Sequence, residues 1–201
     1  MSEIHYPKGV TPIAAATKVT PKKKTSPKLR VAAGNRGMSF EEAINASNAY
    51  YAEKGLCLIT KRPTPIRVSK VDYSHGAKIT AAFYEKQSTT DYNGVYDGHY
   101  SDFEAKETRA KASFPLNNIP KQQIEHLKSV LSQKGIAFFL IRIVAEGKVY
   151  LLPAEYVILF YEKRERASIP FASIKEHGFP VPEGYRPRYD FLPVVKDVFL
   201  K

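Results

Sequence analysis

Two acidic residues and a lysine flank a predicted tight turn in the middle of this 201-residue sequence. Asp97-Gly98 is a strong signal for a two-residue β-hairpin, because both turn positions need a positive φ angle. Positions paired across such a turn have residue numbers with a constant sum, here 195, so we expect Asp91 to lie opposite Glu104. Opposed side chains have Cβ atoms about 5 Å apart. The two-residue period of a strand puts Asp102 and Lys106 on the same face as Glu104.

This spacing favours a divalent metal site. Two carboxylates about 5 Å apart repel by roughly 3 kcal/mol at an effective dielectric constant near 20, unless a proton or cation lies between them. An oxygen-only pocket suits Mg²⁺, with Mn²⁺ as a candidate substitute. Lys106 is suited to orient an attacking water or to neutralise a phosphorane. On spacing alone an alternative stays open, namely a solvated hairpin face on which Lys106 pairs with the two acids.

The charge balance indicates a partner rich in phosphates. There are 31 Lys and Arg against 20 Asp and Glu, and the net charge is +11. An excess of this size is typical of nucleic-acid binding, with an anionic membrane surface as the main competitor. The single cysteine excludes a disulfide framework and a structural zinc site. With no apolar run long enough to span a bilayer and no signal peptide, we expect a cytoplasmic protein that binds no membrane.

The first part of the chain reads as a disordered basic arm over residues 1–34. Residues 1–30 carry seven Lys or Arg against one Glu, with four prolines and no hydrophobic periodicity. We expect phosphate contacts from Lys22, Lys23 and Lys24 in this arm.

Order is expected from about residue 35, in a single domain over residues 35–201. Ser39 and Glu42 form a predicted capping box for a helix that ends at Gly55. The pattern predicts a mixed sheet with helices on its faces. The expected strands are 56–60, 66–72, 78–85, 91–96, 99–107, 136–144 and 149–152. The expected helices after the first are 119–134, 154–166 and a short one near 172–177, and the rest of the proline-rich C-terminal region is expected to be mostly irregular.

Several long motifs resemble the RecU family of Holliday-junction resolvases. The resemblance covers about residues 35–201. The motifs that carry it are Asn35-Arg36-Gly37-Met38, Lys61-Arg62-Pro63-Thr64-Pro65, the run from Gln87 to Tyr96, Asp102-Phe103-Glu104-Ala105-Lys106-Glu107-Thr108, Ser113-Phe114-Pro115-Leu116, Gln123-Ile124-Glu125-His126, Gly184-Tyr185 and Pro187-Arg188.

The resemblance implies an α/β fold of the restriction-endonuclease-like PD-(D/E)xK type, with a mixed central sheet, flanking helices and a protruding β-hairpin stalk at about 66–85. It also implies a homodimer in which two Mg-dependent sites nick opposed strands of a four-way DNA junction, during homologous recombination and DNA repair. A nucleoid-associated location follows. A RecA-type recombinase is a further candidate partner, although no residue of this sequence argues for it physically.

The same resemblance assigns the site residues. It implies that Thr89, Asp91, Glu104 and Gln123 contact the metal and that Lys106 stabilises the transition state. This sequence departs from the PD signature, because Thr90 stands where the proline is expected.

The remaining candidates are weaker or carry only phosphate contacts. We expect DNA contacts from Arg36 and from Arg67, Lys70 and Lys78 of the stalk, for which an ordinary sheet edge is the alternative. Glu41 is a further candidate carboxylate, whereas Glu42 is explained by capping. From the residues alone, Gln123 reads as an ordinary surface residue, Asp102 as a group behind the site or in solvent, and His126 as a helix-surface residue.

Two alternative functions stay open at this stage. One is a nuclease for linear or flapped duplex, and the other is an idle architectural protein for branched DNA. The second is disfavoured, because opposed carboxylates without a metal would repel phosphates.

Overall fold

The computed structural model describes residues 38–85, 89–163 and 165–200. The chain divides into two units, Met1–Arg36 and Gly37–Lys201, and the structure describes residues of the second. The predicted arm over 1–34, with Lys22, Lys23 and Lys24, lies outside the described residues, and so does Arg36. None of the described helices is long and apolar enough to cross a membrane.

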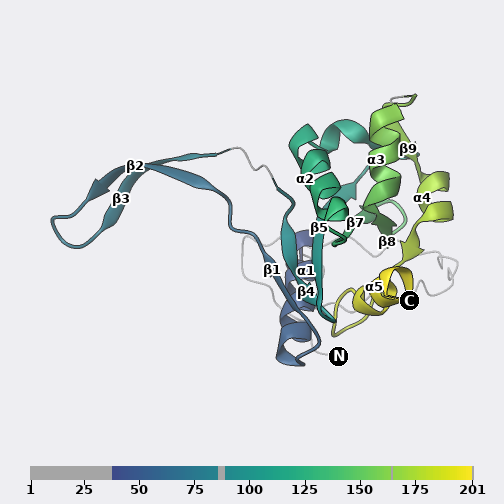
Figure 1. Cartoon of the computed structure of the whole chain (residues 1–201), viewed down its shortest axis with the longest axis horizontal. Coiled ribbons are helices and arrows are strands. Elements are labelled where there is room, and N and C mark those ends of the chain that lie inside the picture. Colours follow the sequence, from purple (N-terminus) through teal and green to yellow (C-terminus); the bar gives the residue numbers. More distant parts are fainter. Residues whose placement is uncertain (1–37, 86–88, 164, 201) are drawn as a thin grey trace, which may run out of the picture. The chain divides into compact units, whose positions relative to one another are not determined.

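A six-stranded mixed sheet forms the centre of the second unit (Figure 1). Its order is β1-β4-β5-β7-β8-β10, and β5 and β7 are its one parallel pair among the described residues. The strands are β1 (Leu58–Lys61), β4 (Tyr92–Tyr96), β5 (His99–Thr108), β7 (Ile136–Ile143), β8 (Lys148–Pro153) and β10 (Phe179–Pro180). A parallel pair needs a crossover, and here the chain between β5 and β7 supplies α2 (Lys121–Ser132).

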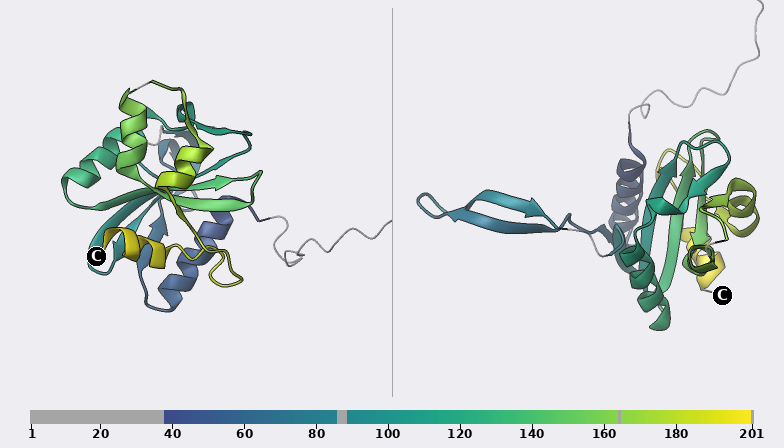
Figure 2. Two further views of the ribbon diagram at one scale, coloured as in Figure 1. Left: turned by 90° about the vertical axis from the view of Figure 1, so that its right-hand side faces the viewer. Right: turned by 90° about the horizontal axis from the view of Figure 1, so that it is seen from above.

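Helices cover both faces of this sheet (Figure 2). On one face α2, α3 (Ala154–Lys163) and α4 (Phe171–His177) pack on Phe139 and Ile141 of β7. On the other face α1 (Phe40–Glu53) and α5 (Leu192–Phe199) pack around Phe138 and Leu140. Strand β7 contributes alternate residues to both cores, which explains its almost continuous apolar sequence. The predicted α/β architecture, a mixed central sheet with flanking helices, is confirmed.

The predicted capping box at the start of α1 is confirmed. The Glu42 backbone N–H donates to Ser39 Oγ at 3.2 Å, and the Ser39 N–H donates to Glu42 Oε2 at 2.7 Å. Gly55, with a φ of 65°, follows the helix as predicted. This cap fixes where α1 begins, and with it the face that α1 presents to the sheet.

A separate hairpin projects from the sheet, as predicted for the stalk (Figures 1 and 2). Its strands are β2 (Ile66–Asp72) and β3 (Lys78–Tyr84), which pair only with each other. Every residue of the two strands is exposed except Val71 and Ala81, which are half-buried. The Glu85 backbone N–H donates to Pro65 O at 3.0 Å, which closes the base of the hairpin.

Several short elements were not predicted. The segment between β5 and α2 forms β6 (Ser113–Pro115) and the 3-10 helix η2 (Leu116–Asn118), and β6 pairs with β9 (Ser168–Pro170) of the C-terminal region, where α5 follows. The expectation of a mostly irregular segment was wrong at α5 because Pro193 lies in its first turn, where a missing N–H costs nothing. Leu192 and Val195 are buried on one side of this helix.

Candidate active site

The register computed from the Asp97-Gly98 turn is confirmed. Strands β4 and β5 pair from Tyr96 opposite His99 to Tyr92 opposite Phe103, so every pair has the sum 195. Both turn residues have positive φ, 47° at Asp97 and 75° at Gly98.

Asp91 itself lies in a bend just before β4, rather than in the strand where it was predicted. The ladder ends at Tyr92 opposite Phe103, but beyond it the Asp91 backbone N–H donates to the side chain of Glu104, at 3.0 Å from Oε2. Asp91 and Glu104, which the register of the turn predicts to be neighbours, therefore lie next to each other.

Glu104 is a carboxylate in the core of the protein. Its side chain is fully buried on β5, and Lys106 Nζ lies 2.5 Å from its Oε1. Burial raises the pKa of Glu104 to about 8, Lys106 opposes this rise, and the charge of Asp91 adds to it. A buried carboxylate is unfavourable unless its negative charge is balanced. A cation that binds beside Glu104 would therefore stabilise its ionised form. The alternative of a solvated hairpin face does not hold for Glu104.

Gln123 provides a second buried oxygen. It lies in the first turn of α2 and is 4% exposed, so the reading as an ordinary surface residue was wrong. Its Nε2 donates to Thr89 O at 3.4 Å. Its Oε1 has no hydrogen-bond partner among the described residues. A buried acceptor without a donor is unfavourable and is accounted for by a ligand or ion that the amide oxygen contacts.

The donor set fits a hard divalent cation. Within the described part of the chain, no three His, Cys, Asp or Glu side chains gather in a group suited to hold a metal. The available ligands are two carboxylates and neutral oxygens, which excludes the thiolate and imidazole sites that zinc prefers. Few carboxylates completed by water are typical of Mg²⁺ and Mn²⁺. The residues present therefore fit the metal that the sequence predicted.

Asp102 lies two residues before Glu104 and is also fully buried, so of its two predicted readings, behind the site or in solvent, burial excludes the second. It accepts hydrogen bonds from Arg62 at 2.7 Å, Tyr100 at 2.8 Å and His126 at 2.9 Å, and also from Thr90. Burial alone would raise the pKa of Asp102, but these donors outweigh burial and hold it below its ordinary value. His126 thus points to an internal carboxylate rather than to solvent.

Arg62 was not selected from the sequence as a site residue. It lies in the proline-rich segment between β1 and β2, and the guanidinium reaches the residues just before Asp91. Nothing in the local pattern marks it, because its partners come from distant parts of the chain. In the sequence, Arg62 was noted only as part of the motif Lys61-Arg62-Pro63-Thr64-Pro65, one of those that carry the family resemblance.

The other predicted residues lie outside this cluster. Glu41, the candidate further carboxylate, pairs with Lys61 at the exposed start of α1, and Glu42 is the capping residue. The stalk residues are exposed on β2 and β3, as phosphate contacts require. They are Arg67, Lys70 and Lys78.

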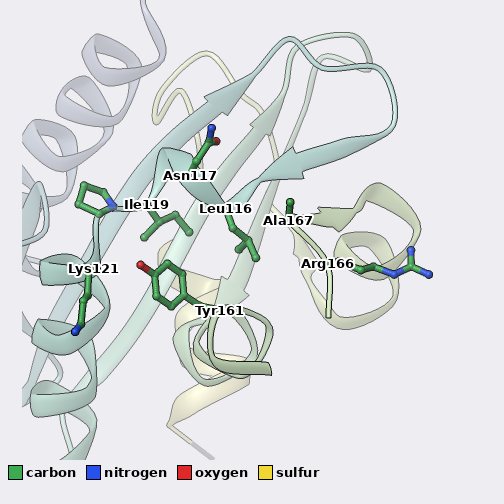
Figure 3. A pocket seen from close by; sticks show the side chains of 8 residues that line it. Leu116, Asn117, Ile119, Lys121, Tyr161, Arg166 and Ala167 are labelled. Atoms are coloured by element: carbon green, nitrogen blue, oxygen red, sulfur yellow. The ribbon is translucent and has the colours of Figure 1, made fainter. Parts of the chain in front are cut away.

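An open hollow of about 530 Å³ lies away from these residues, between α3 and the start of α2 (Figure 3). Its lining contains no carboxylate, and neither Asp91 nor Glu104 contributes to it. The lining residues are Leu116, Asn117, Ile119, Pro120, Lys121, Tyr161, Arg166 and Ala167. The chemistry suggested by the sequence is therefore not in this hollow.

Fold and site together define an α/β protein with a buried glutamate beside a half-buried aspartate, an adjoining lysine and a projecting basic hairpin. Residues 35–197 match the family model described as "Recombination protein U", and the chain belongs to that family.

Relatives named "Holliday junction resolvase RecU" match most of the chain. The protein from Lactococcus lactis subsp. cremoris (strain MG1363) is 49% identical over 94% of this chain and 88% of its own. The protein from Streptococcus sanguinis (strain SK36) is 50% identical over 83% of this chain and 84% of its own. A solved structure of Archaeoglobus fulgidus Hjc, described as a Holliday junction resolvase, aligns with 76% of this chain and 98% of its own at a TM-score of 0.35 and 11% identity.

Proposed function

We propose that this protein is an endonuclease that resolves four-way DNA junctions by paired, metal-dependent nicking during homologous recombination and repair. The observation that carries the proposal is Glu104, a fully buried carboxylate between the Asp91 N–H and Lys106 Nζ. The names of the relatives supply the substrate. The nuclease domain would span 35–201, with 1–34 as a basic DNA-binding arm.

Four residues would hold the metal: Thr89, Asp91, Glu104 and Gln123. Gln123 supports this assignment, because its buried Oε1 lacks a donor among the described residues. Mg²⁺ fits the oxygen-only set, and Mn²⁺ would substitute for it. When bound, such an ion polarises a phosphoryl oxygen and lowers the pKa of a bound water.

Lys106 would stabilise charge in the transition state. Its ammonium group is paired with Glu104, yet the side chain keeps 24% of its surface exposed. It is therefore placed to reach from the buried carboxylate to a phosphate at the surface. A fixed positive charge beside the phosphate needs no reorganisation as negative charge develops on the oxygens.

Junction recognition would come from the stalk and from pairing of two subunits. The site residues offer no base-reading groups, so they cannot by themselves separate a branched substrate from a linear one. Arg67, Lys70 and Lys78 on the exposed hairpin supply phosphate contacts at a distance from the sheet. A homodimer would present two sites to opposed strands. A cytoplasmic, nucleoid-associated location accords with this substrate, and a RecA-type partner stays a prediction of the resemblance.

The test compares cleavage of a mobile four-way junction with cleavage of linear duplex of the same sequence, each with Mg²⁺ and with EDTA. We expect symmetrical nicks in the junction with Mg²⁺ only. Equal cutting of both substrates would indicate a general duplex nuclease. Junction binding without cutting under any divalent cation would indicate an architectural protein.

A further inference from the structure

Arg62 lies at the base of the stalk and beside the proposed metal site. Strand β1 ends at Lys61, and the chain passes through Arg62 and three further residues before β2 begins. The stalk returns through β3, and Thr89 follows a few residues later. The segment with Arg62, which leads into the stalk, and the segment with Asp91, which follows the stalk, therefore lie close together.

Both the backbone and the side chain of Arg62 hold the residues around Asp91. The Arg62 backbone N–H donates to Asp91 O at 2.8 Å. One guanidinium nitrogen donates to Thr90 O at 3.2 Å and to Thr90 Oγ1 at 2.9 Å. Two successive residues of the bend are thus bonded to one arginine.

The other end of the guanidinium is anchored on β5. Its second terminal nitrogen donates to Asp102 Oδ2 at 2.7 Å and to Tyr100 OH at 2.9 Å. Asp102 also accepts from Thr90 Oγ1 and from His126 Nε2. Since an ionised carboxylate only accepts, His126 carries a proton on Nε2.

The geometry of arginine suits this bridging role. The guanidinium is planar and presents its donors in fixed directions. When one of its terminal nitrogens is bonded to Asp102, the position of the other, which donates to Thr90, is therefore fixed as well. Asp102 cannot move easily, because it is fully buried and a buried charge is tolerated only when it is well paired. Asp102 shares its strand with Glu104, so the anchor and the second carboxylate form one rigid element.

We propose that Arg62 is a positioning residue that latches the Thr90–Asp91 segment to β5 and so sets Asp91 against Glu104. This inference rests on the proposed function, because the position of Asp91 matters only if the two carboxylates form the nuclease site. Arg62 also joins this latch to the stalk through Pro63 and Pro65, which restrict the backbone. The latch thus ties the root of the junction-recognising element to the cutting site.

The variant Arg62→Met tests the latch, because it keeps an unbranched apolar stem and removes every donor of the guanidinium. We expect the single-turnover cleavage rate, at saturating junction and Mg²⁺, to fall on the order of 100-fold, the effect of a displacement of about 1 Å at a reacting group. The junction Kd, measured in EDTA, should be unchanged, because the guanidinium is engaged with Thr90, Tyr100 and Asp102 inside the protein.

A second variant separates positioning from folding. Arg62→Met leaves Asp102 without its cationic partner, which should lower the Tm. In the double variant Arg62→Met/Asp102→Asn no unpaired buried charge remains, so the Tm should recover. The cleavage rate should stay low, because the guanidinium bonds to Thr90 are still missing and only the backbone bond from residue 62 to Asp91 O remains. Recovery of the rate together with the Tm would overturn the proposal.

Arg142→Met is the matched control. Arg142 is also partly buried and pairs with β5, but its ion pair is with Glu107, at 3.6 Å, instead of with Asp102. Its cleavage rate should equal that of the wild type, and a decrease as large as that of Arg62→Met would overturn the proposal. The proposal would also be overturned if Arg62→Met cut at the wild-type rate while Asp91→Asn was inactive. If the wild-type protein cuts no junction, the proposed function fails instead, independently of the latch.

Discussion

Replacing Glu104 with glutamine should stabilise the metal-free protein at neutral pH while removing its activity. Glutamine has the same shape as protonated glutamate and carries no charge. Burial raises the pKa of Glu104 to about 8, from an ordinary value of 4.5. The folded metal-free protein therefore takes up a proton at this site that the unfolded chain releases.

The size and sign of the effect follow from this difference in pKa. An acid whose pKa is raised on folding contributes its full stability below 4.5, and that stability is lost as the pH rises toward 8. Each pH unit within this window costs about 1.4 kcal/mol. Between pH 5 and pH 7 the free energy of unfolding of the wild type should therefore fall by about 3 kcal/mol relative to Glu104→Gln.

The assay is urea denaturation in EDTA at pH 5 and pH 7, at one fixed protein concentration. Glu107→Gln on the same strand is the control, because Glu107 is exposed and its replacement should give no pH-dependent difference. Added Mg²⁺ should stabilise the wild type at pH 7 and have little effect on Glu104→Gln. A difference between Glu104→Gln and wild type that is the same at both pH values would refute the reasoning, because Glu104 would then ionise normally in the folded protein.

Four further predictions follow from the proposed function. Asp91→Asn should abolish cutting and spare junction binding, since it lessens repulsion of phosphates; cutting near the wild-type rate would exclude Asp91 from the site. Lys106→Ala should cut poorly yet still bind Mg²⁺, as measured by calorimetry, and a failure to bind Mg²⁺ would point to a structural lysine. Deletion of residues 1–30, with seven Lys or Arg against one Glu, should flatten the salt dependence of DNA binding by about 0.9 in log–log slope for each phosphate that the arm neutralises. An unchanged slope would show that the arm does not touch DNA. Replacing residues 70–79 with an Asn-Gly turn should leave a folded, metal-binding dimer with equal affinity for junction and duplex, and a retained preference for junctions would place specificity elsewhere.

The pairing of the central hairpin, β4 and β5, could be predicted closely because it depends only on residues within the hairpin. The turn at Asp97-Gly98 fixes the register, and the register fixes which residues face each other. The proximity of Asp91 and Glu104 therefore followed from residue numbers alone, and the Asp91 N–H bond to Glu104 agrees with it. The two strands at 66–72 and 78–85 were also predicted from local pattern, whereas their projection as a stalk was implied by the family resemblance.

The surroundings of the site could not be predicted, because burial depends on elements that are distant in the sequence. Gln123 is a polar residue at the start of a predicted helix, and nothing in the neighbouring sequence reveals that the start of α2 lies over Thr89. Asp102 was placed on the correct face, but its environment depends on Arg62 and His126, which come from a loop and a helix. Helix α5 was missed because proline was read as a helix breaker, although at the first turn it is compatible with a helix.

The two proposed tasks of the protein make opposite demands on structure, which explains why a latch between them is needed. Recognition by shape needs a long exposed element, and β2 and β3 are exposed along almost their whole length. An isolated two-stranded hairpin is only marginally stable in water. Catalysis needs the reverse, because carboxylates that are displaced by about 1 Å lose most of their effect. Asp91 follows the exposed hairpin in the chain, whereas Glu104 belongs to the central sheet. The bonds of Arg62 to Thr90, Asp91 and Asp102 give Asp91 the rigidity of β5 without shortening the stalk.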